Sequence, residues 1–382
     1  MRILFSSRPS YGHVYPMMPL AYAARAAGHE VAFATTGTFL ERLARLGFPV
    51  RPAGISIDDA ALRLIAETGA TGFPRDERGR PDLSFGGRMF ADVLARATTS
   101  DLLELFDAER PDLVVYEQGD LGAGIAAGLV GVPAVLLGIS PQWPDALVEQ
   151  HLRPWLDGIW ADHGVERPTV DAAFGDGYLD IFPRALQEPS VVAHPHRMAL
   201  RPVPWAEPGS PLPHVPADGS RPLVYVTLGT VVANDDVLRL VLEGVASLDA
   251  HVLVALGAAA GDLGALPDHV QVQAFLDQSR LMPAVDLVVH HGGSGTVLGA
   301  LAHGVPQLVL PQGADQFVNA DLLEAADLAQ VIEPHDLTAD EVATAAKTAL
   351  AERRPAVDAV RAEIAARPSP AELVPTLVER FG

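Results

Sequence analysis

The sequence of 382 residues contains no cysteine and only one lysine, Lys347. Without cysteine the chain has no disulfides, no thiolate nucleophile and no thiolate metal ligand. Lys347 lies in a stretch patterned as a surface helix, 339–351, so a P-loop lysine or a Schiff-base lysine has no candidate. Basic residues are also few, 27 against 48 acidic ones, for a net charge of −21. Because nucleic acids and anionic membranes bind basic surfaces, we expect neither as a partner.

Long hydrophobic runs are lacking as well. The apolar run at the N-terminus is too short for a signal peptide. The longest uncharged stretch, 121–144, has the length of a membrane span, but glycines and Pro133 interrupt it repeatedly. This pattern favours a short helix, a turn and a buried strand. We therefore expect a cytoplasmic protein.

Apolar residues make up 49% of the chain, and the length exceeds that of one hydrophobic core, so we predict two domains. Short β-branched runs alternate with helical patterns, which is typical of parallel sheets built from βαβ units. We predict strands at 2–7, 30–35, 112–116, 133–138, 223–228, 251–256, 270–274, 286–290 and 307–310. Between them we predict helices after His13, after Gly37, across 86–109 and 119–130, and from about Asp235, Ser294, Asp315 and Thr338.

A proline-rich segment, 201–222, breaks this rhythm and indicates a linker. The predicted fold class is α/β, with two Rossmann-like, doubly wound domains facing a cleft. The predicted division is a first domain at 1–205, a linker at 206–221 and a second domain at 222–365. A C-terminal helix at 366–382 is expected to pack back on the first domain. Ligands of such sheets bind at the carboxyl ends of the strands.

The strongest motif runs from Asp286 to Leu301, Asp-Leu-Val-Val-His-His-Gly-Gly-Ser-Gly-Thr-Val-Leu-Gly-Ala-Leu. It predicts a buried strand ending at His290, a glycine turn, and a helix opening near Ser294. Glycines allow close approach of a ligand, and a helix start presents free N–H groups to an anion. Ser294, Thr296 and His290 can add side-chain donors. The alternative is an ordinary capped turn between a strand and a helix.

A second motif, 304–316, ends in Asp315 and Gln316, just past another predicted strand. A carboxylate beside an amide suits the adjacent hydroxyls of a sugar ring. The alternative for an Asp-Gln pair at a helix start is an N-cap.

The run from Val270 to Asn319 resembles the donor-binding signature of the family-1 glycosyltransferases, which have the two-domain GT-B fold. It is most similar to bacterial members that act on macrolides, enediynes and aromatic polyketides, and the resemblance covers nearly the whole chain. The resemblance implies that the first domain binds an acceptor and that the second binds a nucleotide sugar.

Within the signature, Phe275 stands where the family usually has a nucleobase-stacking Trp, and Asp277 stands where proline is usual. The resemblance implies that Phe275 stacks on the base, that the Leu276 backbone reads its edge, and that Asp315 and Gln316 hold the sugar. It also implies that the diphosphate is held by His290, Ser294, Gly295 and Thr296, and that Thr230, in the first loop of the second domain, contacts phosphate. Gln278 and Gly292 complete the expected donor-binding residues.

The first predicted turn, Arg8-Pro-Ser-Tyr-Gly-His, resembles the family's Gly-His motif. A helix N-terminus disfavours imidazolium, so His13 is expected to be neutral and to act as general base. Such a base needs a partner for its other ring nitrogen. The candidates are Glu117, where the family generally has Asp, and Asp120. We prefer Glu117; the alternative for both is capping of the helix from Gly119.

Two aromatic-rich segments fit no regular pattern, 55–90 and 143–182. They are candidates to wall an apolar pocket, with Phe73, Phe85, Trp143 and Trp155 as expected acceptor-binding residues and with Phe90 and Trp160 nearby. The alternative is ordinary packing between domains. The pair His194 and His196 reads as a surface turn rather than as a metal site.

We therefore expect a metal-independent, inverting glycosyltransferase with no cofactor. It would move a deoxysugar from thymidine diphosphate to a hydroxyl of an apolar natural-product aglycone. A nucleotide-sugar epimerase of GT-B fold and a non-catalytic auxiliary homologue are the alternatives. The expected partners are the nucleotide sugar and the small-molecule acceptor, with a monomer or homodimer as the assembly. The sequence leaves open the sugar, the base, the acceptor and the glycosidic atom.

Overall fold

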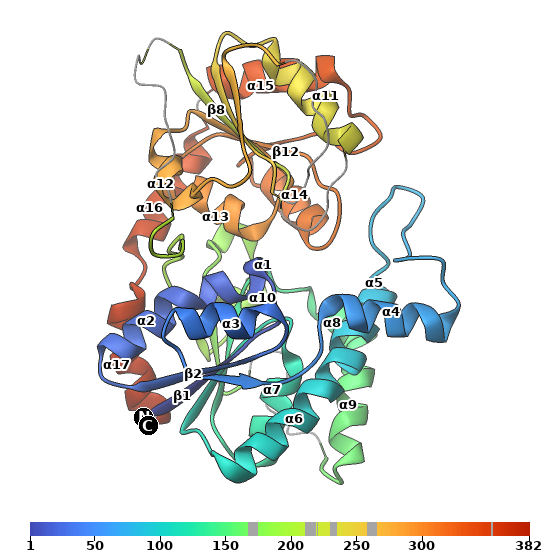
Figure 1. Ribbon diagram of the computed structural model, residues 1–382, viewed down its shortest axis with the longest axis vertical. Coiled ribbons are helices and arrows are strands. Elements are labelled where there is room, and N and C mark those ends of the chain that lie inside the picture. Colours follow the sequence, from blue (N-terminus) through green and yellow to red (C-terminus); the bar gives the residue numbers. More distant parts are fainter. Residues whose placement is uncertain (167–174, 211–218, 220, 230–234, 258–265, 353) are drawn as a thin grey trace. The chain divides into compact units, whose positions relative to one another are not determined.

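Two parallel β-sheets, one in each of two structural units, organise the chain (Figure 1). The computed structural model describes all residues except 167–174, 211–218, 220, 230–234, 258–265 and 353. Unit 1 consists of Met1–Asp76, Pro81–Val203 and Arg367–Gly382. Unit 2 consists of Pro204–Ala366 together with the short loop Glu77–Arg80, which the predicted division placed in the first domain.

The sheet of unit 1 has the strand order β3-β2-β1-β4-β5-β6-β7, and each recorded pairing is parallel. The four strands predicted in this half are present within two residues of their predicted ends. Three short ones, β3, β6 and β7, were not predicted. The strands are β1 (Arg2–Ser6), β2 (Glu30–Thr35), β3 (Val50–Pro52), β4 (Leu113–Glu117), β5 (Ala134–Gly138), β6 (Gly177–Asp180) and β7 (Arg197–Ala199).

Helices cover both faces of this sheet, as right-handed crossovers require (Figure 1). Helices α2 and α3 lie on one face, and α6 and α7 pack together on the other. The helices of unit 1 are α1 (Tyr11–Val14), α2 (Met18–Ala26), α3 (Thr38–Arg45), α4 (Ile57–Thr68), α5 (Leu83–Arg88), a π-helical turn η2 (Met89–Leu94), α6 (Ala95–Ala108), α7 (Leu121–Leu129), α8 (Asp145–His151), α9 (Arg153–Asp162), α10 (Pro189–Ala193) and α17 (Pro370–Phe381).

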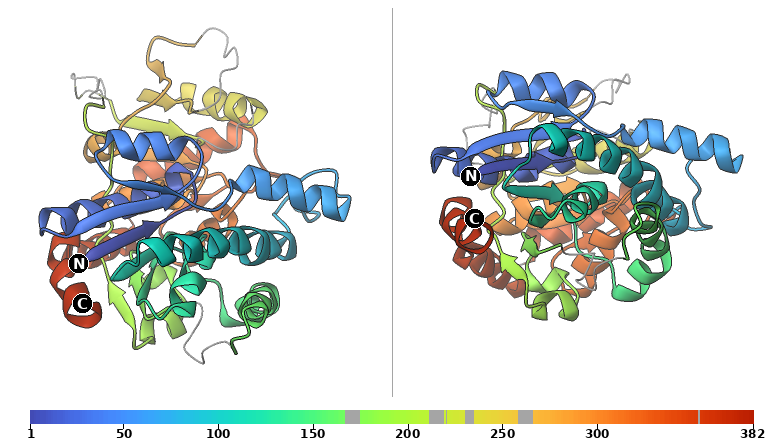
Figure 2. Two further views of the ribbon diagram at one scale, coloured as in Figure 1. Left: turned by 60° about the horizontal axis from the view of Figure 1, so that its bottom comes forward. Right: turned by 90° about the horizontal axis from the view of Figure 1, so that it is seen from below.

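The C-terminal helix α17 belongs to unit 1 and packs against α2, close to both chain ends (Figure 2). Ser369 and Glu372 form a capping box at its start, which satisfies two backbone N–H groups. The buried Arg367 just before it donates to the carbonyl oxygen of Asp180 at 3.0 Å. These bonds fix the end of the chain on the edge of the first sheet.

The sheet of unit 2 repeats the same order, β10-β9-β8-β11-β12-β13, again with parallel pairings. Only the two-residue strand β13 was not predicted. The strands are β8 (Leu223–Thr227), β9 (His251–Ala255), β10 (Val270–Gln273), β11 (Leu287–His290), β12 (Gln307–Val309) and β13 (Gln330–Val331). The helices are α11 (Asp235–Ala246), α12 (Gln278–Leu281), α13 (Ser294–His303), α14 (Gln316–Ala325), α15 (Ala339–Ala351) and α16 (Pro355–Ala366).

Alternation along the strands divides the core of unit 2 into two layers. On β8, Val224 and Val226 join a cluster with α11 and α15. Leu223 and Tyr225 point to the other face and join a cluster with α12 and α13. The strands are therefore buried on both faces, as in doubly wound sheets. The predicted α/β fold with two Rossmann-like sheets is confirmed.

Both sheets reverse their strand order at one point, between β1 and β4 in unit 1 and between β8 and β11 in unit 2. In open α/β sheets, ligands bind beyond the carboxyl ends of the strands at such a point. In unit 1 these ends are Ser6 and Glu117, and in unit 2 they are Thr227 and His290. The topology thus marks one candidate ligand site in each unit. Among the described residues, no helix is long and apolar enough to cross a membrane.

Candidate active site

His13 and Glu117 lie together at the switch point of unit 1. Nδ1 of His13, on the short helix α1, is 3.0 Å from Oε1 of Glu117, the last residue of β4. The His13 side chain is 18% exposed, and Glu117 is fully buried. No bond to Nε2 is recorded within the described part of the chain. A carboxylate at Nδ1 favours the tautomer with its proton there, so the lone pair of Nε2 is available to accept a proton.

The Glu117 carboxylate is held in its charged form. Burial by itself raises the pKa of Glu117, but the nearby His13 ring and two backbone donors outweigh it and hold the pKa below its ordinary value. The donors are the N–H groups of Arg8, at 3.0 Å from Oε1, and of Gly119, which bonds Oε2. An ionised Glu117 stabilises an imidazolium at His13, which is what a general base becomes after it takes a proton.

Gly119 allows the His13 ring to approach β4 this closely. A Cβ atom at position 119 would lie 2.8 Å from Cε1 and 3.1 Å from Nδ1 of His13. Any side chain there would push the imidazole away from Glu117. Glycine at position 119 is therefore required for the close approach of His13 to Glu117.

Asp120, the second candidate partner of His13, is engaged elsewhere. Its Oδ2 accepts a hydrogen bond from Ser6 Oγ at 2.6 Å, and its Oδ1 pairs with the guanidinium of Arg8. Asp120 is the N-cap residue of α7, yet its side chain makes no capping bond. The structure thus brings Glu117, and not Asp120, to His13.

An aromatic ring faces the same imidazole from the π-helical turn η2. The rings of Phe90 and His13 are nearly parallel, at 13°, with centroids 6.5 Å apart. A π-helical turn carries one extra residue and often occurs at functional sites. Phe90 was noted in the sequence only as a neighbour of the expected acceptor-binding residues. Its place beside His13 makes it an apolar wall of the candidate site.

The four expected acceptor-binding residues occupy varied environments. Phe85 is a core residue of the cluster with Leu64 and Met89. Phe73 is 38% exposed and packs edge-on against Phe85 at 4.9 Å. Trp155 is half-buried beneath the Arg88 guanidinium, and Trp143 is half-buried near His151. No recorded ring contact joins any of the four to His13.

The switch point of unit 2 is the glycine turn between β11 and α13. Gly292 adopts φ +88°, and a Cβ there would meet Val309 at 3.0 Å. Helix α13 then begins at Ser294, and the N–H groups of Ser294 and Gly295 have no recorded partner in the described chain. A Cβ on Gly295 would meet nothing within 4 Å. Free N–H groups at a ten-residue helix favour an anion.

His290 contacts this turn from its buried side, whereas the sequence interpretation placed its ring against the diphosphate. It is fully buried, its Nδ1 accepts the Gly292 N–H at 3.1 Å, and its Nε2 lies 3.1 Å from Gln307 Oε1. Burial, together with His291 nearby, lowers the pKa of His290 to about 3, so the ring is neutral. Both ring nitrogens have partners within the protein, and the ring holds the turn through the Gly292 N–H.

His291 presents the imidazole instead. Its ring is partly exposed and lies against Gly229 and Gly293, where a Cβ would come within 2.9 Å and 2.4 Å of Nε2. Its Nδ1 is 3.4 Å from the carbonyl oxygen of Thr227. His290 is the last residue of β11, and His291, which follows it, is the first residue of the turn.

Asp315 is tied to the glycine turn by a small polar network. Its Oδ2 accepts from Ser294 Oγ at 2.8 Å and from Asn319 Nδ2 at 3.3 Å. Asn319, which is buried, also donates to the carbonyl oxygen of Gly292 at 2.8 Å. Asn319 was absent from the predicted site, although it lies at the end of the resembling run. It joins the candidate diphosphate turn to the candidate sugar carboxylate.

The other predicted donor residues surround this network. Gln316 Oε1 accepts the N–H groups of Gln312 and Gly313, at 2.8 and 3.0 Å. The hydroxyl of Thr296 donates to Gln278 Oε1 at 3.1 Å and so links α13 to α12. Thr230 lies outside the described residues.

Phe275 is the most exposed aromatic residue of this region, at 48%. Leu276 beside it is buried, and its backbone N–H and C=O make no recorded hydrogen bond in the described chain. Asp277, which stands where proline is usual, caps α12 by accepting from Ser279 N at 3.0 Å. An open ring next to unpaired backbone groups fits a stacked, edge-read base.

The whole chain matches known proteins along both units. Two family models, both described as erythromycin biosynthesis protein CIII-like, match it, the N-terminal domain over residues 22–187 and the C-terminal domain over residues 239–380. An L-demethylnoviosyl transferase of Streptomyces niveus is 33% identical over 88% of this chain and 86% of its own. The elloramycin glycosyltransferase of Streptomyces olivaceus is 33% identical over 100% of this chain and 98% of its own. The chain belongs to the family-1 glycosyltransferases.

The fold of this glycosyltransferase is also that of solved relatives. The crystal structure of glycosyltransferase VinC in complex with DTDP superposes with a TM-score of 0.78, at 26% identity, over 100% of this chain and 99% of that one.

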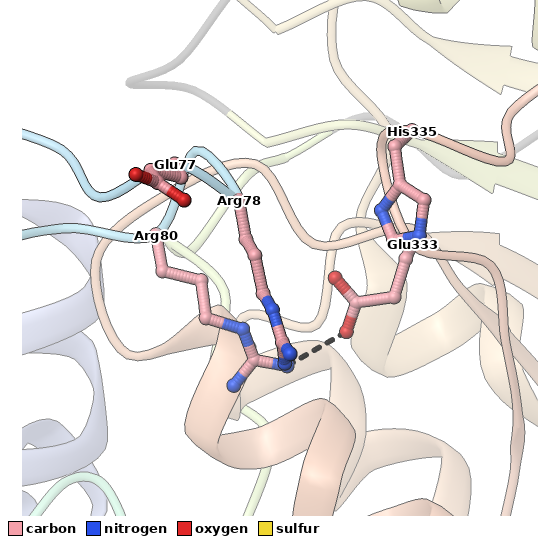
Figure 3. A pocket seen from close by; sticks show the side chains of 5 residues that line it. All are labelled: Glu77, Arg78, Arg80, Glu333 and His335. Atoms are coloured by element: carbon pink, nitrogen blue, oxygen red, sulfur yellow. Dashed lines mark hydrogen bonds and ion pairs between the residues drawn. The ribbon is translucent and has the colours of Figure 1, made fainter.

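A hollow in unit 2 of the glycosyltransferase is lined by Glu77, Arg78, Arg80, Glu333 and His335 (Figure 3). Arg80 donates to both oxygens of Asp321, at 2.7 and 2.9 Å, and to Glu333 at 2.8 Å. Its hydrogen bonds with Asp321 are the main cause of the raised pKa of the Arg80 guanidinium. The guanidinium also lies over the Phe317 ring, at 5.2 Å. Because Phe317 and Asp321 are on α14, the loop braces the helix that begins with Gln316.

Among the residues that the structure describes, no group of three or more His, Asp or Glu side chains is arranged to hold a metal ion. His194 and His196 have rings 5.6 Å apart, and the Nδ1 of His194 accepts the backbone N–H of His196 at 3.3 Å. The pair therefore forms a local turn of the glycosyltransferase.

Proposed function

We propose that the enzyme transfers a deoxysugar from thymidine diphosphate to a hydroxyl of an apolar natural-product aglycone, with inversion at the anomeric carbon. The observation that carries the proposal is His13 Nδ1 at 3.0 Å from the buried, ionised Glu117. Relatives support the substrate classes: one is a desosaminyl transferase of Saccharopolyspora erythraea named for its mycarosylerythronolide acceptor, and another is a TDP-daunosamine transferase of Streptomyces peucetius.

One displacement accounts for the reaction. Nε2 of His13 takes the proton of the acceptor hydroxyl, whose oxygen forms a bond to the anomeric carbon. The bond between that carbon and the diphosphate oxygen breaks, and its electron pair leaves with the diphosphate. Glu117 stabilises the imidazolium that results. Attack opposite the leaving group inverts the configuration.

The departing diphosphate carries the charge that develops on the donor side. The free N–H groups of Ser294 and Gly295 and the imidazole of His291 are the groups available to hold it. Asp315, with one oxygen engaged by Ser294 and Asn319, offers the other to the sugar hydroxyls. The exposed Phe275 ring is the stacking surface for the base. Because a diphosphate is a good leaving group, these fixed donors suffice without an acid catalyst.

Phe90 is assigned to the acceptor. We expect Phe90→Ala to raise the acceptor KM roughly 10- to 100-fold, because burying an aromatic ring against an apolar ligand is worth roughly 1.5–3 kcal/mol. The donor KM should stay unchanged. The acceptor KM of Phe90→Leu should lie between that of the wild type and that of Phe90→Ala. Steady-state kinetics with each substrate varied in turn measures both constants. An unchanged acceptor KM in Phe90→Ala would remove Phe90 from the acceptor site.

A single incubation tests the proposed function against its alternatives. The protein is mixed with a TDP- or UDP-sugar and a panel of hydroxylated aglycones, and nucleotide release and product mass are followed. Transfer gives a conjugate and releases nucleoside diphosphate. An epimerase gives an isomer of unchanged mass, and an auxiliary binding protein gives neither product; either result contradicts the proposal.

A further inference from the structure

A buried ion pair next to the active site has no place in the reaction above. Arg8, just after β1, and Asp120, just after β4, pair with each other, and both side chains are 2% exposed. Arg8 also donates to Thr98 Oγ1 on α6 and, at 3.4 Å, to the carbonyl oxygen of Ile55. Asp120 also accepts from Ser6. A buried ion pair of this kind gains little stability over apolar residues, so a specific role has to explain it.

Arg8 touches the catalytic pair as well. Its backbone N–H donates to Glu117 Oε1 at 3.0 Å, and this is the same oxygen that faces Nδ1 of His13. Arg8 therefore bonds one carboxylate through its backbone and the other through its side chain.

The charges of the cluster explain what the pair accomplishes. Burial lowers the pKa of Arg8 to about 10, with the negative charge of Glu117 opposing the shift, so the guanidinium is protonated at neutral pH. The cluster then holds one guanidinium and two carboxylates. Because the guanidinium is paired with Asp120, Glu117 is the carboxylate whose charge is left to act on His13.

We propose that Arg8 is a positioning residue for the transfer: its backbone holds Glu117 beside His13, and its guanidinium neutralises Asp120 so that Glu117 alone sets the charge state of the base. This inference rests on the proposed role of His13 as general base.

The surroundings add few other charges. The groups that face the cluster are Ser6 on β1, Thr98 on α6, the Ile55 carbonyl and the apolar ring of Phe90. A further carboxylate, Asp101, accepts the N–H of Gly54 at 2.8 Å, and Gly54 lies against the guanidinium. A substitution of Arg8 or Asp120 is therefore expected to change the charge state of His13 in two ways. It acts on Glu117, and the altered charge also interacts directly with the imidazole.

The test compares three variants by the pH dependence of kcat/KM. In Arg8→Met, Asp120 becomes a second uncompensated negative charge that favours imidazolium, so the acidic limb should move up by about one pH unit. In Asp120→Asn, the guanidinium is left unpaired and disfavours imidazolium, so the limb should move down by a similar amount. In the double variant both charges are gone, and the limb should return close to that of the wild type. Arg8→Lys keeps the charge and should also leave the limb near its wild-type position.

A second readout needs no catalysis. The imidazole of His13 is titrated by NMR in the free protein and assigned by comparison with His13→Gln. The midpoint of this titration should move up in Arg8→Met and down in Asp120→Asn. Folding is checked by circular dichroism. If Arg8→Met does not fold, the comparison of Asp120→Asn with the double variant still isolates the effect of the guanidinium. Shifts of the same sign in both single variants, or no shift, would overturn the inference.

These outcomes differ from failure of the proposed function itself. A wild-type enzyme that gives no conjugate, or a His13→Ala variant that keeps the acidic limb, contradicts the proposed function. The NMR titration of His13 still decides the role of Arg8 in that case.

Discussion

Replacing His13 by alanine is expected to lower kcat/KM for glycosyl transfer by about 10³-fold, within the range typical of general-base catalysis. The variant loses the group that takes the acceptor proton, while the glycine turn of unit 2 is untouched. The Kd for the nucleotide sugar should therefore stay within about twofold of the wild-type value. Transfer is followed by release of nucleoside diphosphate, and donor binding by calorimetry without acceptor.

The matched control is His163→Ala, since His163 is exposed at the end of α9 and contacts none of these residues. It should be fully active. A His13→Ala enzyme that transfers sugar at a comparable rate would eliminate His13 as the base, and loss of donor binding in that variant would show a general structural defect.

His291→Ala is expected to raise the Kd for a TDP-sugar by roughly 10²-fold and to remove its pH dependence, because a single donor to a buried anionic oxygen contributes about this much. Nδ1 faces the Thr227 carbonyl oxygen, which only accepts, so Nδ1 carries the proton of the neutral ring. Nε2 can then donate to the diphosphate only when the ring is imidazolium.

The direction of the pH effect follows from the two states of His291. In the free enzyme burial lowers its pKa, with the Thr227 carbonyl and Asp315 opposing, so the ring is neutral at pH 7. The bound diphosphate favours imidazolium and raises the pKa of His291 in the complex. Proton uptake accompanies binding, and donor affinity should fall as the pH rises from the lowered pKa of the free His291 ring through its higher pKa in the complex.

An intact TDP-sugar is the appropriate probe, because its diphosphate carries no ionisation of a terminal phosphate in this range. The control is His303→Ala, at the far end of the same helix α13, which should leave both the affinity and its pH dependence unchanged. A wild-type affinity that is constant or that increases with pH would contradict protonation of His291.

The strands with strong β-branched patterns could be predicted from the sequence, and those without them could not. Val-Val runs mark β4 and β11, Val-Leu runs mark β5 and β9, and the ends of these strands lie within two residues of the predictions. The strands that were missed are β3, β6, β7 and β13, which are two to four residues long. β6, Gly-Tyr-Leu-Asp, has no β-branched residue and is fixed by its neighbours in the sheet. Local pattern carries little information about such strands.

The glycine turn, Asp315 and the closeness of Glu117 to His13 follow from motifs at the ends of strands, which topology brings together. Other parts of the site depend on contacts that no motif displays. The Arg8–Asp120 pair joins residues far apart in the chain. The sequence around Arg8 predicts only a loop residue and does not indicate its partner. The two adjacent histidines are alike in the sequence, and only the structure shows that the His290 ring is buried and that the His291 ring is partly exposed.

The most direct test of the central claim is the configuration of the anomeric carbon in the product. The wild-type enzyme is supplied with a TDP-sugar of one defined anomer and an accepted aglycone, and the conjugate is examined by NMR coupling constants at the anomeric proton. Direct attack by a hydroxyl deprotonated at His13 predicts the opposite anomer in the product. A conjugate with the anomer of the donor would require two displacements, and it would contradict this account.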